Sequence, residues 1–193
     1  REKHEKIRED LRRYPGNTGT EKYRKTCNIG HLRRNTILRW RYKTMIKILF
    51  ICHGNICRSP MAEFILRDML EQTGKEGEIA VSSAAVSREE LGNPVYPPAR
   101  RVLAAHGIRC EGHAARQMTA QDYEKYDLLI GMDRSNITRM CRICGGDPDG
   151  KMSRLLDHTC RPGDVADPWY TGEFEATWRD IEEGCRALLD ELG

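Results

Sequence analysis

From residue 45 onward the chain alternates between short apolar runs and stretches whose apolar residues have helical spacing. Residues 46–51 (IKILFI) form an apolar run of the length and composition that predict a buried strand. The next stretch has apolar residues three and four positions apart, which predicts one buried helix face. The residues of this face are Ala62, Ile65, Leu66, Met69 and Leu70.

Capping signals and the later periodic stretches complete the predicted α/β pattern. We expect Ser59 to cap the first helix, Pro60 to take its first position and Gly74 to end it. The other predicted elements are a strand at 79–82, a Pro-rich loop, a helix at 98–106, a strand at 127–132, a helix after Asp133, a short strand at 152–156 and a helix at 173–192. This alternation predicts a parallel four-stranded sheet flanked by helices on both faces, a three-layer α/β fold.

Residues 1–44 have a different character, because they lack apolar periodicity beyond a weak helical patch around Ile7 and Leu11. They contain 14 Lys and Arg against five Asp and Glu, a net charge of +9, whereas residues 45–193 contain 18 against 24, a net charge of −6. A basic arm can bind nucleic acid or another anionic surface. We expect instead a disordered extension, or a segment upstream of a start at Met45, followed by one domain at 45–193.

The composition, 39% hydrophobic and 32% charged residues among 193, is that of a globular protein. The longest apolar stretch, 45–52, is much shorter than the roughly 20 residues that a membrane span needs. The first residues, REKHEKIRED, lack the apolar core of a secretory signal. We therefore expect a cytoplasmic protein without a membrane partner, whose eight cysteines are reduced thiols.

A cysteine followed six residues later by an arginine occurs three times, although about one such pair is expected by chance from this composition. The pairs are Cys27/Arg33, Cys52/Arg58 and Cys110/Arg116. Only Cys52 directly follows a predicted buried strand, and only Arg58 is followed by a Ser-Pro helix start. Since ligands of parallel sheets bind beyond the carboxyl ends of the strands, the sequence favours the Cys52 loop as the functional one.

The loop from Cys52 to Ser59 (CHGNICRS) has the composition of an oxyanion cradle. A chain that wraps between a strand end and a helix start can direct successive backbone N–H groups at a phosphate, which the helix dipole also attracts. Such a wrap needs left-handed backbone dihedrals, which Gly54 and Asn55 tolerate.

The side chains of the same loop supply the chemistry. The field that attracts a phosphate also stabilises a thiolate, so we expect Cys52 to be ionised at neutral pH. The planar guanidinium of Arg58 can hold two phosphate oxygens at once. The hydroxyl of Ser59 can donate a hydrogen bond to the sulfur, which favours the thiolate further.

The segment ICHGNICRSPMAE resembles the active-site loop of the low-molecular-weight protein tyrosine phosphatase family. The resemblance covers Met45 to the C-terminus, and its landmarks follow in the family's order. They are Ser83-Ala84-Ala85, Gly92-Asn93-Pro94, His113-Ala114-Ala115-Arg116-Gln117, Met132-Asp133 and Asp167-Pro168-Trp169-Tyr170. This resemblance implies the family's flavodoxin-like topology and the removal of phosphate from protein phosphotyrosine or a small aryl phosphate, with inorganic phosphate as product.

The resemblance also implies a mechanism that needs no metal and no cofactor. Cys52 would attack the phosphorus, Arg58 would stabilise the phosphate oxygens, and Asp167 would act first as general acid and then as base. Pro168 favours an extended backbone at Asp167, which suits a side chain that must reach a leaving group. If Asp167 only shapes its loop, Asp164 is the alternative acid.

Further site residues are implied by their places in the family pattern. Asn55, Ser59, Ser83 and His113 resemble the network that holds the loop, and His53, Gly54, Ile56 and Cys57 complete its substrate-binding wall. Cys57 also resembles the family's partner for a protective disulfide with an oxidised nucleophile.

The predicted rim of the pocket bears on the substrate. Trp169 and Tyr170 could enclose an aromatic ring. Glu89 stands where some relatives carry an aromatic residue, and we expect it to disfavour acidic peptides. Relatives that act on phosphoarginine carry Thr in place of Ile56, so this residue favours phosphotyrosine.

Four other possibilities remain open on the sequence. An arsenate reductase of the same fold needs two further cysteines, and residues 122–132, where they are expected, contain none. A phosphate-binding module without turnover would not need the complete Cys, Arg and Asp set, and the net charge of the domain disfavours nucleic acid. A zinc half-site would use Cys141, Cys144, His158 and Cys160, but the second CxxC is missing. The oligomeric state is not predicted.

Overall fold

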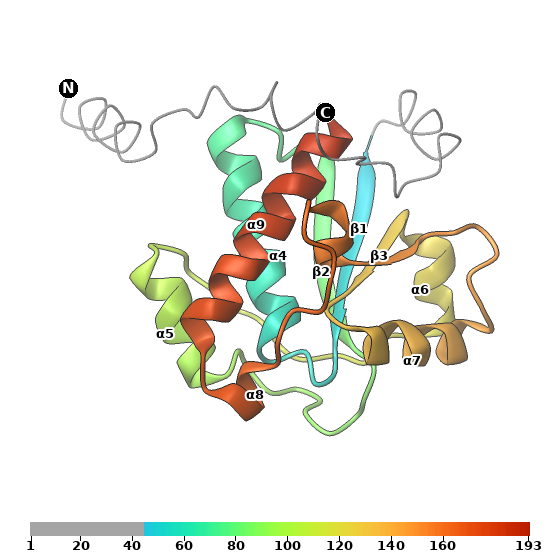
Figure 1. Ribbon diagram of the computed structural model, residues 1–193, viewed down its shortest axis with the longest axis horizontal. Helices are drawn as coiled ribbons and strands as arrows, with labels where there is room; N and C mark the ends of the chain where they lie inside the picture. Colours follow the sequence, from blue (N-terminus) through green and yellow to red (C-terminus); the bar gives the residue numbers. More distant parts are fainter. Residues whose placement is uncertain (1–44) are drawn as a thin grey trace.

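The computed structural model describes residues 45–193, so the expectations for residues 1–44 lie outside the described residues. The centre of the fold is a parallel four-stranded sheet with the strand order β2-β1-β3-β4 (Figure 1). The strands are β1 (Ile46–Cys52), β2 (Ile79–Ala85), β3 (Leu128–Gly131) and β4 (Met152–Arg154). The predicted α/β fold is therefore confirmed.

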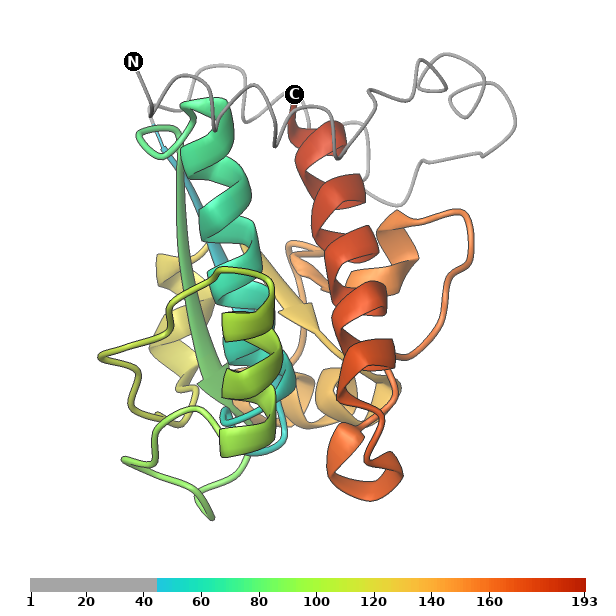
Figure 2. The same ribbon diagram turned by 90° about the vertical axis from the view of Figure 1, so that its left-hand side faces the viewer.

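Helices cover both faces of the sheet and give three layers (Figures 1 and 2). One face is covered by α4 (Arg58–Thr73), α5 (Pro97–Ala105) and α9 (Phe174–Leu192). The other is covered by α6 (Ala120–Lys125) and α7 (Arg134–Cys144). A 3-10 turn, η1 (Leu155–His158), follows β4, and the short helix α8 (Pro168–Thr171) precedes α9.

The alternation of side chains along β1 explains the two cores. Ile48 and Phe50 are fully buried on the side of α4, α5 and α9, whereas Leu49 and Ile51 are fully buried on the side of α6 and α7. Successive residues of a strand point to opposite faces, so a strand buried on both sides must be apolar throughout. The uninterrupted apolar run of β1 is thus explained by its central place in the sheet.

Several predicted boundaries need correction. The first helix begins at Arg58 with Cys57 as its N-cap, and Ser59 is not the cap because its hydroxyl contacts Cys52 inside the loop. The expected strand at 152–156 ends at Arg154, where the chain turns into η1. The helices α6 and α8 were not predicted, because each is too short to show periodicity.

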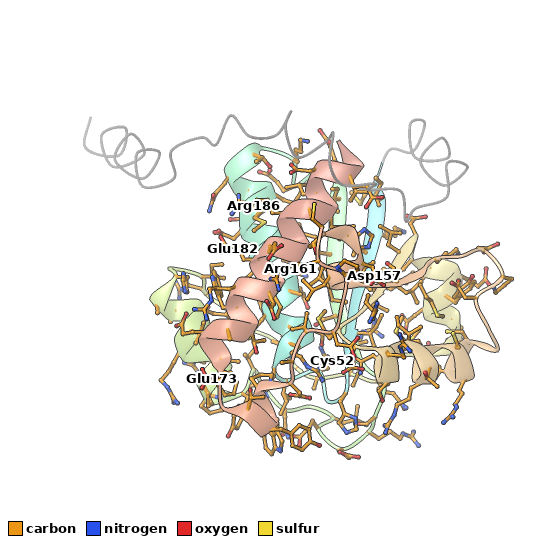
Figure 3. The ribbon with its side chains drawn as sticks, viewed as in Figure 1. Cys52, Asp157, Arg161, Glu173, Glu182 and Arg186 are labelled. Atoms are coloured by element: carbon orange, nitrogen blue, oxygen red, sulfur yellow. The ribbon has the colours of Figure 1, made fainter. Side chains whose placement is uncertain are left out.

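The strand order places a site at the carboxyl edge of the sheet. From β1 the chain passes through α4 to β2 on one side, and β3 leads through α7 to β4 on the other. Such a reversal opens a crevice between β1 and β3, where open α/β sheets bind ligands. Cys52, the last residue of β1, lies at this edge, as does α8 (Figure 3).

Six cysteines in the described part of the chain are free thiols, namely Cys52, Cys57, Cys110, Cys141, Cys144 and Cys185. Cys160 is disulfide-bonded, so the expectation that all eight cysteines are reduced is wrong. Among residues 45–193, no helix combines the length and the apolar character that crossing a bilayer requires.

The packing of α9 against η1 can be tested at Gly184. A Cβ atom there would lie 2.5 Å from Cγ and 2.9 Å from Cδ1 of Leu155, which is fully buried. Overpacking typically costs about 1–3 kcal/mol, and a 2.5 Å approach to a buried branched carbon belongs to the upper half of this range, from which the better helix propensity of alanine subtracts about 1 kcal/mol. We expect Gly184→Ala to lower the free energy of unfolding by about 1–2 kcal/mol in urea titration.

Gly77 provides a matched control, because a Cβ atom there would meet nothing within 4 Å. Gly77→Ala should leave the free energy of unfolding unchanged or slightly higher. A Gly184→Ala protein as stable as the wild type would contradict this account of the contact between α9 and η1.

Candidate active site

The loop after β1 turns its carbonyl oxygens away from the crevice. The carbonyls of residues 52, 53, 55, 56 and 57 accept hydrogen bonds from Val86 N, Ser87 N, His113 Nε2, Tyr96 N and Met61 N, respectively. With the carbonyl oxygens bound elsewhere, the backbone N–H groups of the loop are left for a ligand in the pocket. The first N–H groups of α4, which begins at Arg58, also lack partners within the helix. Both features suit a bound oxyanion.

Asn55 holds the shape of this loop. It is fully buried, and its φ of 59° makes it the one residue other than glycine with a left-handed backbone in the described chain. Its Nδ2 donates to Ser59 Oγ at 2.9 Å and to Ser83 Oγ at 2.8 Å, and its Oδ1 accepts from Arg116 N at 3.1 Å. The side chain therefore ties the loop to α4, to β2 and to the segment after His113.

The network continues from Ser83 to a residue that was not predicted, Glu63. Ser83 donates to Glu63 Oε2 at 2.5 Å, and Glu63 Oε1 pairs with Arg67 at 2.6 Å. Glu63 lies in the segment that carries the family resemblance, one helical turn after Ser59 on α4. The sequence therefore contained a signal that could have identified it as a site residue. The predicted supporting residues Ser83 and His113 both contact Asn55, as expected.

Cys52 is almost completely buried, and its sulfur lies within reach of two donors. The backbone N–H of Asn55 donates to it at 3.3 Å, and the hydroxyl of Ser59 lies 3.1 Å away. Ser59 Oγ accepts a hydrogen bond from Asn55, and its own proton faces two acceptors, the sulfur at 3.1 Å and Ala84 O at 3.4 Å. Burial, and secondly the neighbouring Cys52, raise the pKa of the Cys57 thiol well above its usual range. The two sulfurs of the loop are thus placed in different electrostatic environments.

The guanidinium of Arg58 lies between two carboxylates at the edge of the pocket. It donates to Asp133 Oδ2 at 2.7 Å, to Val165 O at 3.1 Å and to Asp167 Oδ2 at 2.5 Å. Burial opposes its charge, but Cys52, Asp167 and Asp133 outweigh burial and raise its pKa. Asp133 was not predicted as a site residue. It also caps α7, because Oδ1 accepts from Asn136 N at 2.6 Å.

The chain before Asp167 is held to the sheet and to α9. Val165 N donates to Met132 O at 2.8 Å, and Arg161 pairs with Asp180 and Glu183 of α9. Figure 3 shows Arg161 beside that helix. Asp167 has the extended backbone expected before Pro168, and its Oδ1 accepts from Trp169 N at 3.1 Å. These contacts place the Asp167 carboxylate opposite the phosphate loop, which is formed by residues 52–59.

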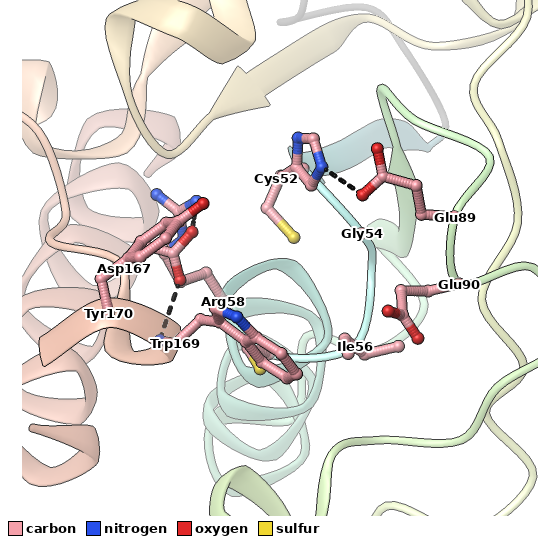
Figure 4. A pocket seen from close by; sticks show the side chains of 11 residues that line it. Cys52, Gly54, Ile56, Arg58, Glu89, Glu90, Asp167, Trp169 and Tyr170 are labelled. Carbon is pink, nitrogen blue, oxygen red and sulfur yellow. Dashed lines mark hydrogen bonds and ion pairs between the residues drawn. The ribbon is translucent and has the colours of Figure 1, made fainter. Parts of the chain in front are cut away.

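These elements enclose a pocket of about 150 Å³, shown in Figure 4. Its floor is the Cys52 loop, and its sides carry the predicted rim residues Glu89, Trp169 and Tyr170. Trp169 packs on Tyr96, with ring centroids 5.0 Å apart, and Tyr170 is 86% exposed. Glu90 also lines the pocket and was not predicted, because only the loop geometry after β2 turns it inward.

The structure decides two details that the sequence left open. Gly54 does not have a left-handed backbone; space is what restricts this position, since a Cβ atom would lie 3.0 Å from Glu90 Cγ. Asp164, the alternative acid, pairs with Arg154 at 2.7 Å and is not among the residues that line the pocket.

The other cysteine motifs lie apart from the pocket. Cys110 is buried in the core, and Arg116 pairs with Asp122 at 2.9 Å; Cys27 lies outside the described residues. His158 uses both ring nitrogens, on Ser153 at 2.9 Å and on Glu191 at 2.6 Å. Over residues 45–193, no group of His, Cys, Asp and Glu has the arrangement of a metal site.

Similarity to known proteins agrees with this geometry. Residues 47–193 match the family model of low molecular weight phosphotyrosine protein phosphatases. The chain is 42% identical over 150 residues to the low molecular weight protein-tyrosine-phosphatase YfkJ of Bacillus subtilis, covering 77% of this chain and 96% of that one. It is 33% identical over 150 residues to low molecular weight phosphotyrosine protein phosphatase 1 of Drosophila melanogaster, covering 75% and 96%.

Solved structures give the same result. The crystal structure of YfkJ from Bacillus subtilis superposes with a TM-score of 0.76 at 40% identity, covering 78% of this chain and 96% of that one. The structure of Vibrio vulnificus Wzb in complex with benzylphosphonate superposes with a TM-score of 0.67 at 27% identity, covering 77% and 99%. The chain therefore belongs to the low molecular weight phosphotyrosine protein phosphatase family and is a cysteine-based protein-tyrosine-phosphatase.

Proposed function

We propose that this protein removes phosphate from the phosphotyrosine of proteins through a cysteinyl-phosphate intermediate formed on Cys52. The observation that carries the proposal is the convergence of Cys52, Arg58 and Asp167 on one pocket with aromatic side chains at its mouth. The benzylphosphonate bound by the structurally similar Wzb combines an aromatic ring with a phosphonate, as a phosphotyrosine mimic would. The same pocket accepts small aryl phosphates.

The first step transfers the phosphoryl group to sulfur. The thiolate of Cys52 attacks the phosphorus in line, so that an S–P bond forms as the bond to the tyrosine oxygen breaks. Arg58 and the loop amides bind the equatorial oxygens, and Arg58 exchanges its contact with Asp167 for the phosphate. Asp167, freed from this ion pair and protonated, gives its proton to the leaving phenolate.

The second step regenerates the enzyme. Asp167, now a carboxylate, takes a proton from a water molecule that attacks the phosphorus of the intermediate. The S–P bond breaks, inorganic phosphate leaves, and Cys52 returns to the thiolate. The hydrogen bonds from Asn55 N and Ser59 Oγ stabilise this thiolate both as nucleophile and as leaving group. No step requires a metal ion.

No observation favours the alternative functions. An arsenate reductase would pass a disulfide outward through further cysteines. Among the described residues, Cys52 and Cys57 are the only cysteines that line the pocket. Cys141 and Cys144 lie on α7, where the Cys141 sulfur contacts the Met152 sulfur at 3.7 Å. A binding module would not need Asp167 at the leaving-group side.

Removal of the nucleophile tests the assignment directly. Cys52→Ser should lower kcat for p-nitrophenyl phosphate by at least about a thousandfold, because the serine hydroxyl is not ionised at neutral pH. The assay contains EDTA, and full activity of the wild type is expected in its presence. Cys110→Ser is the control, since Cys110 belongs to the same spacing motif but lies in the core. A comparable loss in both variants would refute the loop assignment.

The role of Asp167 is tested through the leaving group. A general acid contributes roughly 10²–10⁴-fold, and its contribution grows as the leaving group becomes poorer. Asp167→Asn should therefore slow the burst of cysteine phosphorylation much more with phosphotyrosine than with an activated aryl phosphate. Rapid-quench measurement of the burst is required, because steady turnover can report hydrolysis of the shared intermediate. Equal slowing with both substrates would leave Asp167 with a role in loop shape only.

The two loop cysteines should differ in reactivity. The raised pKa of Cys57 keeps its thiol protonated at pH 7, whereas two hydrogen-bond donors face the Cys52 sulfur. Iodoacetamide at pH 7 should therefore modify Cys52 first, and inorganic phosphate should slow this reaction by occupying the pocket. Peptide mass spectrometry over time measures both rates. Faster labelling of Cys57 would contradict the proposed charge distribution.

A further inference from the structure

The two sides of the pocket mouth differ in chemistry. Figure 4 shows Glu89 and Glu90 on one side, and Asp167, Trp169 and Tyr170 on the other. Both glutamates belong to the loop that follows β2, and both line the same cavity as Cys52. A substrate that enters the phosphate loop must therefore pass between an acidic side and an aromatic side.

The two glutamates are held in place by contacts with the rest of the site. Glu89 Oε2 lies 2.9 Å from His53 Nε2, in the phosphate loop. Arg139 of α7 approaches the other ring nitrogen of His53 at 3.5 Å. Glu90 accepts from Asn93 Nδ2 at 2.7 Å and packs against the backbone of Gly54. Their carboxylates are thus fixed at the mouth.

Among the residues described, the one side chain that contacts the Glu89 carboxylate is the imidazole of His53. Within residues 45–193, no ion pair joins Glu89 or Glu90 to a lysine or an arginine. The charge of Arg58 is already matched by Asp133 and Asp167, and in the working enzyme by the phosphate. The Glu89 side chain is 70% exposed, so it can meet a side chain of the substrate. A complementary group on the substrate would be cationic.

We infer that Glu89 and Glu90 make the enzyme select phosphotyrosines that are flanked directly by Lys or Arg. This inference rests on the proposed function, because it specifies which protein phosphotyrosines the pocket accepts. With the phosphate in the loop, the neighbouring residue of the substrate lies at the rim. A lysine there gains an ion pair with the glutamates, whereas a glutamate there is repelled.

The test compares peptides that differ only beside the phosphotyrosine. Alanine-rich phosphopeptides carry Lys or Glu, either before or after the phosphotyrosine, and release of inorganic phosphate gives kcat/KM for each. An exposed ion pair changes an equilibrium by roughly 1.4- to 5-fold, and a like-charge contact acts by a similar factor in the opposite direction, so we expect roughly two- to thirtyfold preference for Lys over Glu in at least one position. Since salt screens exposed charges, the preference should fall toward one in 0.5 M NaCl.

Charge-neutralising variants test whether Glu89 and Glu90 cause the preference for Lys over Glu. The double variant Glu89→Gln, Glu90→Gln keeps the side-chain shape and removes both charges, so its Lys-to-Glu ratio of kcat/KM should approach one. The ratio is taken within each variant and does not depend on overall activity. Glu76→Gln is the matched control, because Glu76 is exposed in the connection between α4 and β2 at the other end of the sheet. It should keep the wild-type ratio.

Three results would overturn the inference. One is a wild-type ratio at or below one in both positions, and another is a preference that persists unchanged in the double variant. Both would leave the proposed function intact, because the peptides are still hydrolysed. If the enzyme hydrolyses p-nitrophenyl phosphate but no phosphopeptide, the proposed function fails as well.

Discussion

Asn55 is buried in a left-handed conformation, and its side chain is hydrogen-bonded at both polar atoms. The remaining geometry of the phosphate loop depends on this residue. A non-glycine residue with positive φ is strained, and it persists only where the surroundings fix it. Here Ser59, Ser83 and the backbone of Arg116 do so, from three elements far apart in the chain. The buried network therefore supports the loop conformation that leaves its amides for the phosphate.

Charge is concentrated on the same small volume. Arg58 is almost completely buried and lies among Cys52, Asp133 and Asp167, and within residues 45–193 it is the one lysine or arginine that lines the pocket. Asp133 also caps α7, so a second contact holds it beside Arg58. In the same part of the chain Asp167 pairs with no other lysine or arginine, and in the proposed mechanism the phosphate replaces its contact with Arg58. On that proposal one carboxylate holds the arginine while the other serves the leaving group.

Chemistry and selectivity are carried by different parts of the pocket. The phosphate loop is formed by backbone groups and buried side chains, whose positions tolerate little change. The rim is formed by exposed side chains, Glu89 and Tyr170 among them, on the loop that follows β2 and on α8. Substitution at the rim can therefore change the preferred substrate without disturbing the thiolate or Arg58. The acidic side of the rim is the feature from which we infer the preferred substrate.

The sequence by itself determined the layer order of the fold and the position of the phosphate loop, because both depend on local patterns. An apolar run predicted β1. The place of the Cys52 loop, directly after this run and before a Ser-Pro helix start, predicted the cradle, because the Cys-Arg spacing alone occurs three times. Asp167 was predicted through family resemblance, since nothing local distinguishes it among 29 acidic residues. Only the tertiary structure decided which partners Glu63, Glu90 and Asp133 contact. Their roles arise from contacts between segments distant in the chain, and such contacts leave no periodic signal.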